Sequence, residues 1–198
     1  MRRMTRIILL VVLVISLCGI TTTPVNAAGG QKQKAHGAGK TCADLAQFGW
    51  SGTDESHINF TFEAPDKGYY EYRTFAGPWA GSWARIEVKG LYFGSYEGNP
   101  AVYYWGQCTA GETYTDLDYP GIPFYMLDYL VPYTNIEGWY KVGVMIDGGP
   151  GHENDGGLFA AEIPPDGEAQ AQQMFNMAID GEIEFGYGSL VTGNINIK

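Results

Sequence analysis

Residues 139–163 decide the fold class, and they read WYKVGVMID (139–147), GGPGHENDGG (148–157) and LFAAEI (158–163). The first segment alternates between two sets of side chains, which is the period-2 pattern of a half-buried strand. One set is Tyr140, Val142, Val144 and Ile146, and the other is Lys141, Gly143, Met145 and Asp147. Five glycines and a proline in the second segment favour chain reversals. The stretch therefore predicts two strands joined by a loop that gathers acidic side chains.

The same alternation recurs outside this stretch, between turn signals rich in glycine and proline. It covers residues 56–63, 69–75, 84–93, 101–108, 182–187 and 192–197. Residues 168–179 carry a helical pattern, with Ala171, Met174, Phe175 and Ala178 on one face. Residues 112–138 are rich in tyrosine and proline and predict a long, ordered aromatic loop. We expect a mainly β protein, an antiparallel β-sandwich or jelly roll with one short helix and this loop.

The N-terminal residues have the composition of an export signal. Three arginines precede an apolar run over residues 7–20, and Val25 and Ala27 are the small residues expected before a cleavage site. We expect residues 1–27 to be a signal peptide, residues 28–55 a flexible linker and N-terminal segment, and residues 56–198 the β-sandwich domain. The mature protein would then be extracellular or located at the cell surface.

Charge narrows the class of partner. The formal net charge is −10, and removal of residues 1–27 takes away three arginines and no acid. Nucleic acids and anionic membranes need basic patches, so we expect neither as a partner. No other apolar segment is long enough to cross a bilayer, so we expect no membrane span in the mature chain.

Removal of the signal peptide would leave two cysteines, Cys42 and Cys108. An even number of cysteines in an oxidising compartment predicts a disulfide between them. In the chain-entropy description, a bond that closes such a loop stabilises the fold by about 4 kcal/mol. A catalytic thiol and a metal pair are weaker alternatives, because neither cysteine has a second ligand nearby in the sequence.

Three motifs occur in order, and together they carry a resemblance. They are ARIEVKGLYFGSYEGNPAVYYWGQC (84–108), VMIDGGPGHENDGGLF (144–159) and GSLVTGNINIK (188–198). Residues 56–198 resemble an uncharacterised family of small secreted β-domains from bacteria and archaea, with the patterns V-x-D-x-G-x-P-G-x-x-D-x-F and G-x-L-x-G-G-N-I-x-I-H. The positions that fit are Asp147, Gly149, Pro150, Gly151, Gly193, Asn194, Ile195 and Ile197. The aromatic loop, the helix and Lys198 depart from the pattern. The resemblance implies a secreted β-fold, in a family that has no established catalytic residues.

The acidic loop allows two interpretations. Asp147, Glu153, Asn154 and Asp155, with the glycine carbonyls between them, could supply the oxygen ligands that calcium prefers. The same residue types also form Asx turns beside glycine. The spacing is not that of an EF-hand. Calcium is therefore the candidate cofactor, and turn formation is the alternative.

Aromatic residues suggest a second candidate site. Trp79 and Trp83 flank Gly81, and Tyr125 and Tyr129 lie in the aromatic loop. If they are exposed, these rings would stack on sugars; if they are buried, they would close the ends of the sandwich.

The sequence thus predicts a secreted, non-catalytic binding or surface-structural domain, with an extracellular polysaccharide or a cell-surface component as its partner. The alternative is a secreted polysaccharide hydrolase with paired carboxylates, such as Glu153 with Asp155 or Glu182 with Glu184. No hydrolase motif is present to support it.

Overall fold

The computed structural model describes residues 33–48, 51–122, 127, 130–150, 154–183, 185 and 187–198. The strands are β1 (Lys34–Asp44), β2 (Thr53–Glu63), β3 (Lys67–Ala76), β4 (Trp83–Tyr96), β5 (Asn99–Tyr114), β6 (Tyr133–Asn135), β7 (Tyr140–Ile146), β8 (Gly156–Ile163) and β9 (Tyr187–Ile197). A 3-10 helix, Leu45–Phe48, follows β1, and helix α2, Glu168–Ile179, lies between β8 and β9.

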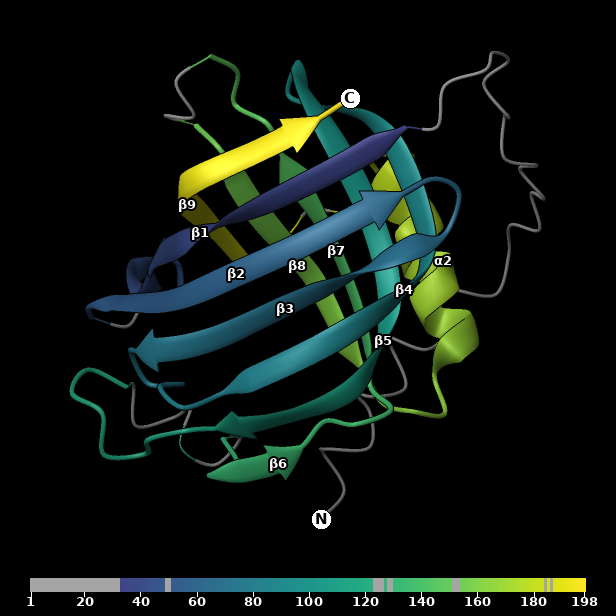
Figure 1. Cartoon of the computed structure of the whole chain (residues 1–198). Helices are drawn as coiled ribbons and strands as arrows, with labels where there is room; N and C mark the ends of the chain where they lie inside the picture. Colours follow the sequence, from purple (N-terminus) through teal and green to yellow (C-terminus); the bar gives the residue numbers. More distant parts are fainter. Residues whose placement is uncertain are drawn as a thin grey trace. The chain divides into compact units, whose positions relative to one another are not determined.

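The strands close into an antiparallel barrel (Figure 1). Its eight strands follow the chain in the order β1-β2-β3-β4-β5-β7-β8-β9, and β9 pairs with β1. The short strand β6 extends the end of β5 outside this ring. The predicted β-sandwich or jelly roll is therefore wrong. A sandwich has two sheets with free edges, whereas β4 pairs with both β3 and β5 and leaves no edge at that point.

Strand length and β-bulges explain why the sheet closes. β4 and β5 span 14 and 16 residues, far longer than the runs predicted from the sequence. Their register shifts between Arg85 and Ile86 and again between Val88 and Gly90. Each bulge bends the strand and increases its twist, so a long sheet with bulges curls until its first and last strands meet.

β1 lies inside the segment that the sequence predicted as a flexible linker. It pairs with β2 along its whole length and with β9 from Ala35 to Cys42. The buried positions of β1 hold small residues, so its sequence shows no alternation of large apolar side chains. The strand could therefore not be recognised from the sequence. Gly39 faces Gly193 across the closing pair, and a Cβ atom on Gly193 would lie 2.3 Å from the carbonyl oxygen of Ala38. Glycine at this position therefore allows β1 and β9 to approach each other.

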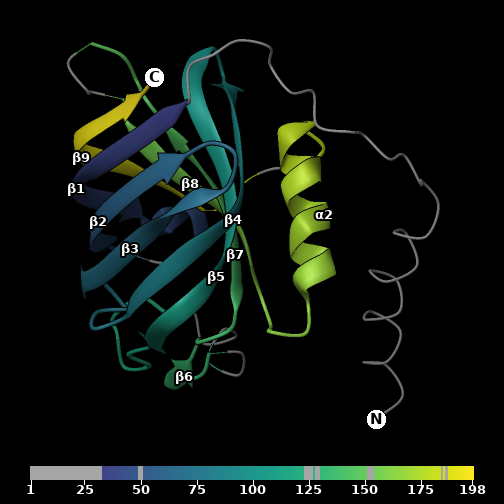
Figure 2. The same ribbon diagram turned by 45° about the vertical axis from the view of Figure 1, so that its right-hand side comes forward.

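Two apolar cores flank the strands β5 and β7. One fills part of the barrel interior, and the other lies between the barrel and α2, the helix that Figure 2 shows beside the barrel wall. The helix predicted over Glu168–Ile179 is confirmed, with Ala171, Phe175 and Ala178 buried. Because α2 covers the outer face of β7, this strand is buried along its whole length rather than on one face.

The predicted disulfide is not formed, since Cys42 and Cys108 are both free. Cys108 is buried within the interior core. Cys42 alternates with the buried residues Thr41 and Ala43 and so lies on the outer side of β1. β1 and β5 are not neighbours in the barrel. Two cysteines on opposite faces of non-adjacent strands cannot reach disulfide geometry.

The predicted signal peptide, residues 1–27, lies outside the described residues. Within the described ranges, each helix is too short or too polar to cross a lipid bilayer.

Candidate functional site

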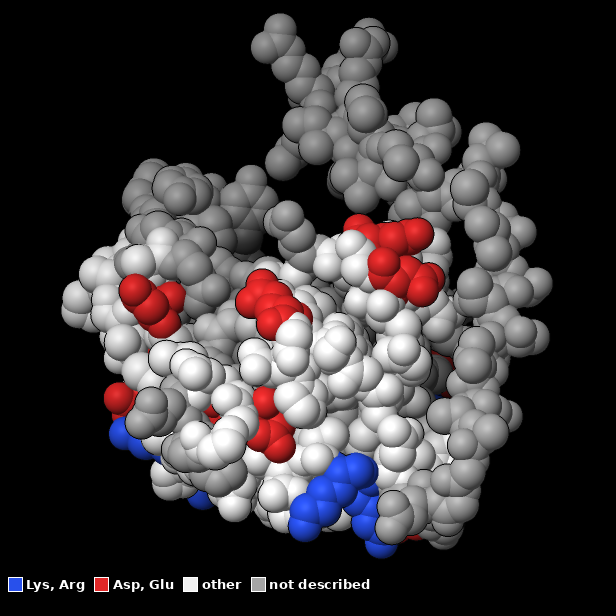
Figure 3. All heavy atoms as spheres, turned by 90° about the horizontal axis from the view of Figure 1, so that it is seen from above, with Lys and Arg blue, Asp and Glu red and all other residues white. Residues whose placement is uncertain are grey.

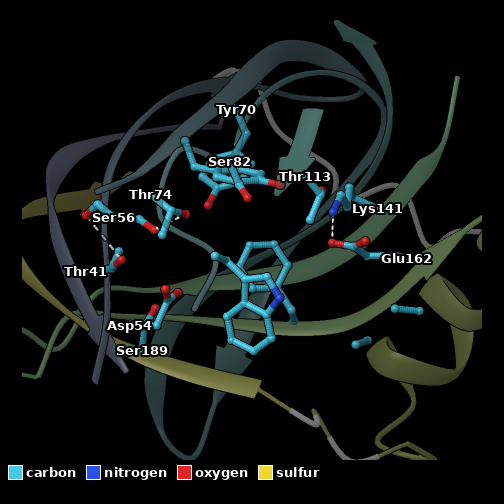
Figure 4. Close-up of a pocket in the computed structure, with 15 residues that line it drawn as sticks. Thr41, Asp54, Ser56, Tyr70, Thr74, Ser82, Thr113, Lys141, Glu162 and Ser189 are labelled. Atoms are coloured by element: carbon cyan, nitrogen blue, oxygen red, sulfur yellow. Dashed lines mark hydrogen bonds and ion pairs between the residues drawn. The ribbon is translucent and has the colours of Figure 1, made fainter. Parts of the chain in front are cut away.

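One end of the barrel interior is hollow (Figure 4). The cavity has a volume of about 430 Å³ and lies at the end of the barrel where the loop between β3 and β4 supplies Trp79 and Ser82. The remaining lining comes from β1, β2, β3, β5, β7, β8 and β9. This volume is within the range of small-molecule sites in proteins.

An aromatic layer separates the cavity from the packed part of the interior. Tyr70 lines the cavity and is 2% exposed. Its ring lies 5.7 Å from that of Tyr104 and 6.0 Å from that of Phe159, measured between centroids. Phe62 packs against the other side of Tyr104 at 5.4 Å. The cavity is therefore a closed-ended pocket with an aromatic floor rather than a channel through the barrel.

Most hydroxyl groups around the cavity are bonded within the protein. Ser56 Oγ and Thr74 Oγ1 share a hydrogen bond of 2.8 Å. Ser82 Oγ donates to the carbonyl oxygen of Tyr114 at 3.1 Å. Thr113 Oγ1 is buried in the same wall and interacts with the Tyr72 side chain, which acts to lower the pKa of Tyr72.

Lys141 is the charged group most deeply buried in this wall. It projects from β7 into the interior, its side chain is 1% exposed, and its ammonium donates a hydrogen bond to Glu162 Oε1 on β8. Its Nζ lies 5.7 Å from the centroid of the Tyr72 ring. An ammonium carries three N–H groups, and Glu162 is its one hydrogen-bond acceptor within the described residues. Two of its N–H groups therefore have no hydrogen-bond acceptor among the described residues.

Burial sets the protonation of these groups. It lowers the pKa of Lys141 to about 7, while electrostatic interaction with Cys108 acts in the opposite direction. Burial also raises the pKa of Tyr72 well above its usual range, with a further contribution from Tyr70. Near neutral pH the tyrosine phenols are thus neutral, and burial favours the uncharged, nucleophilic form of the Lys141 amine, whereas the bond to the Glu162 carboxylate favours the ammonium.

Sequence reasoning missed Lys141 as a functional residue. The alternation in residues 140–147 identified two faces of a strand correctly, but it did not show which face points into the barrel. The apolar face, with Val142 and Val144, packs against α2 outside the barrel. The only signal in the sequence was that Lys141 shares its strand face with Gly143 and Met145, and this signal is weak.

The predicted metal-site residues form a different arrangement. The Asp155 carboxylate accepts hydrogen bonds from the backbone N–H of Gly148 and of Ile195. The Asp147 carboxylate accepts from Gly149 and Ile197 in the same way. Asn154 is exposed, and Glu153 lies outside the described residues. Within the described ranges, no three His, Cys, Asp or Glu side chains are grouped so as to hold a metal ion. Calcium binding stays a prediction.

The predicted aromatic site is divided. Trp79 lines the cavity, Trp83 is 38% exposed on β4, and Tyr125 and Tyr129 lie outside the described residues. Trp83 instead pairs in register with Glu112, whose carboxylate accepts hydrogen bonds from the hydroxyls of Tyr114 and Tyr133. The two tyrosine rings lie 5.3 Å apart. We name Trp83, Tyr114, Tyr133 and Glu112 the outer aromatic cluster.

One face of the molecule, shown in Figure 3, carries acidic side chains that are separated from one another by uncharged surface. Basic side chains lie toward one border of this view. The face thus offers no concentrated charge for a partner to bind.

Comparisons of the chain with protein families, with curated proteins and with solved structures found no match. The resemblance to small secreted β-domains therefore stays a prediction, and the function has to be argued from the site.

Proposed function

We propose that this protein is a secreted, non-catalytic binding protein that holds one small, uncharged, largely apolar molecule inside the barrel. The observation that carries the proposal is the cavity of about 430 Å³ with its aromatic floor and the buried Lys141 in its wall. Eight-stranded barrels are wide enough to hold one small ligand when side chains leave the interior unfilled. Export remains part of the proposal on the sequence pattern of residues 1–27.

The lining favours an uncharged ligand. Lys141 and Glu162 neutralise each other, and Asp54 adds a further carboxylate at the cavity wall. An organic anion would meet net negative formal charge here, and it would also lose its hydration. Apolar contact with Trp79, Tyr72 and the Tyr70 floor would supply most of the binding free energy.

Displacement of a neutral solvatochromic dye, such as Nile red, tests the proposal. The purified protein should bind the dye with a blue-shifted emission, and small neutral aromatic compounds should displace it. Thr113→Phe should abolish dye binding, because the new ring fills the cavity from β5. Thr109→Phe places the same ring on the exposed side of β5 and should leave dye binding unchanged. Equal binding by both variants would refute a ligand site in the barrel.

A second candidate function rests on the outer aromatic cluster. Trp83, Tyr114 and Tyr133 are 38%, 36% and 47% exposed, and Glu112 fixes both tyrosine hydroxyls. Exposed aromatic faces beside a carboxylate can stack on sugar rings and bond their hydroxyls, so the cluster supports the predicted binding of an extracellular polysaccharide. Cosedimentation with insoluble polysaccharides tests it. Trp83→Ala should release the protein from the pellet, whereas Thr113→Phe should not.

The hydrolase alternative stays a prediction. Asp54 and Glu162 line the same cavity, but Glu162 is already bonded to Lys141. Of the carboxylate pairs suggested by the sequence, Glu153 and Glu184 lie outside the described residues.

A further inference from the structure

We propose that Lys141 is a covalent attachment site, whose ε-amine forms an imine with an aldehyde or an unhindered ketone bound in the barrel cavity. The inference rests on the proposed function, because the carbonyl compound must first enter the cavity. It adds the chemical class of the ligand and the atom to which the ligand becomes attached.

The position of the amine is the first argument. Lys141 projects inward from β7, and its side chain is 1% exposed while it lines the cavity together with Glu162 (Figure 4). The amine is therefore shielded from bulk solvent and lies among the residues that line the cavity. The Tyr72 ring, 5.7 Å from Nζ, provides a flat surface against which a conjugated carbonyl compound can lie.

The cost of burying this lysine is the second argument. A buried ammonium needs several acceptors to offset its lost hydration, and among the described residues Lys141 has one. Methionine or leucine would fill the same position at lower cost. Proteins that use a neutral lysine amine as a nucleophile bury it in this way, and burial lowers the pKa of Lys141 to about 7.

The surface lysines provide an internal comparison. Lys89 also donates a hydrogen bond to a carboxylate, that of Glu168, at 2.6 Å, but its side chain is 33% exposed. Its pKa is raised, with the bond to Glu168 as the largest cause. Lys40 pairs with Glu55 at 2.6 Å and is 44% exposed. A carboxylate partner is thus common to all three lysines, whereas burial in a cavity wall distinguishes Lys141.

The reaction balances without any further reactant. Glu162 accepts a proton from the ammonium, and the free amine then attacks the carbonyl carbon to form a C–N bond as the C=O π pair moves to oxygen. Glu162 returns this proton to the oxygen and takes one from the nitrogen, which gives a neutral carbinolamine. Glu162 then protonates the hydroxyl, water leaves as the nitrogen lone pair forms the C=N bond, and Glu162 accepts the remaining proton of the nitrogen. One amine and one carbonyl compound yield one imine and one water.

Reductive trapping of a neutral aromatic aldehyde tests the proposal. The purified protein is incubated with cinnamaldehyde and sodium cyanoborohydride at pH 7.5, and intact mass and peptide mapping follow the product. We expect one adduct per chain, equal to the mass of the aldehyde less one oxygen, on Lys141. Its rate should exceed that on Lys89 by at least tenfold. Lys141→Arg and Lys141→Met should lose this adduct, and Glu162→Gln should slow its formation.

Cinnamyl alcohol separates the two proposals, because it has the shape of the aldehyde and cannot form an imine. If the alcohol displaces Nile red but the aldehyde modifies all lysines at similar rates, the covalent site is refuted while the binding function stands. If neither compound displaces the dye, both proposals fail. A cooperative urea unfolding transition for Lys141→Met, followed by tryptophan fluorescence, shows that this variant is folded.

Discussion

The carboxylate of Asp155 accepts a hydrogen bond of 2.7 Å from the backbone N–H of Ile195, 40 residues further along the chain. β9 pairs with β8 over residues 187–190 only, so the N–H groups of its later residues on that side need other acceptors. The Asp155 carbonyl accepts from Val191 at 2.8 Å, and the Asp147 carboxylate accepts from Ile197 at 3.2 Å. The acidic loop thus continues the hydrogen bonding of the barrel where β8 is absent.

Asp155→Ala should destabilise the protein by about 2–4 kcal/mol, because it leaves two backbone N–H groups without their charged acceptor in a buried site. Urea denaturation followed by tryptophan fluorescence measures this change. Asn154→Ala removes the exposed neighbour and should change the free energy of unfolding by less than about 0.5 kcal/mol. Equal effects of the two substitutions would show that the Asp155–Ile195 bond contributes nothing.

The same bonds bear on the calcium prediction. The Asp147 and Asp155 carboxylates already accept backbone N–H groups, and Asp155 is fully buried. We therefore expect the melting temperature to be the same with calcium and with excess chelator. A ligand at a hundred times its dissociation constant would stabilise the fold by about 2.7 kcal/mol, which is several degrees for a chain of this size. An upward shift with calcium that Asp147→Ala abolishes would instead establish a metal site.

Most strands could be predicted from the sequence, but β1 and the closure into a barrel could not. Of the strand predicted over residues 182–187, only Tyr187 belongs to a strand among the described residues. Residues 84–93 and 101–108 alternate clearly and lie in β4 and β5, which pair as a hairpin. β1 has no such pattern, because Ala35 and Gly37 occupy interior positions beneath larger side chains such as Phe60. Without β1 a sheet keeps two edges, and a sandwich is the natural inference. Closure depends on which strands meet, and alternation within one strand carries no information about that.

Gly193→Val should therefore destabilise the protein strongly, by about 2 kcal/mol or more. A Cβ atom at this position would lie 2.3 Å from the Ala38 carbonyl oxygen and 2.6 Å from the Gly39 Cα, and a backbone neighbour cannot move aside cheaply. Asn194→Val places the same side chain at the next residue, which is exposed and already carries a Cβ atom. It should be close to neutral in thermal melts. Similar melting temperatures for the two variants would contradict a tight seam between β1 and β9.

The candidate site was harder to predict than the fold, for a related reason. Of the residues singled out in the sequence, Trp79 lies in the cavity, while Trp83 lies outside the barrel. Lys141 was not singled out, because a two-layer fold would place the apolar face of β7 inside and the lysine face outside. In the structure α2 covers the apolar face, and the lysine face points into the barrel. Which face of a strand points inward is set by the elements that cover it, and these come from distant parts of the chain.

Lys141 should also make the stability depend on pH in a defined window. Its pKa is about 7 in the folded protein and about 10.5 in an unfolded chain, so between these values the unfolded state binds more protons. Stability must then rise with pH, by about 1.5 kcal/mol from pH 7 to pH 8.5. Below pH 7 the cost of burying the amine is present in full. The ionisable groups that line this site with it are Glu162 on β8, Asp54 on β2, and Tyr70 and Tyr72 on β3, with Cys108 nearby on β5.

The raised pKa values of Cys108 and the tyrosines change the free energy of unfolding only near and above pH 9. Between pH 7 and pH 8.5 the pH dependence of stability therefore reports on Lys141. Urea denaturation at intervals across this range measures the slope. Lys141→Met should be more stable than the original protein at pH 7 and should lose the slope, because methionine has similar length and no charge. Lys89→Met removes an exposed lysine whose pKa is raised and should keep the slope. A slope that survives in Lys141→Met would mean that another group titrates in this window, and that the amine in the cavity is charged throughout it.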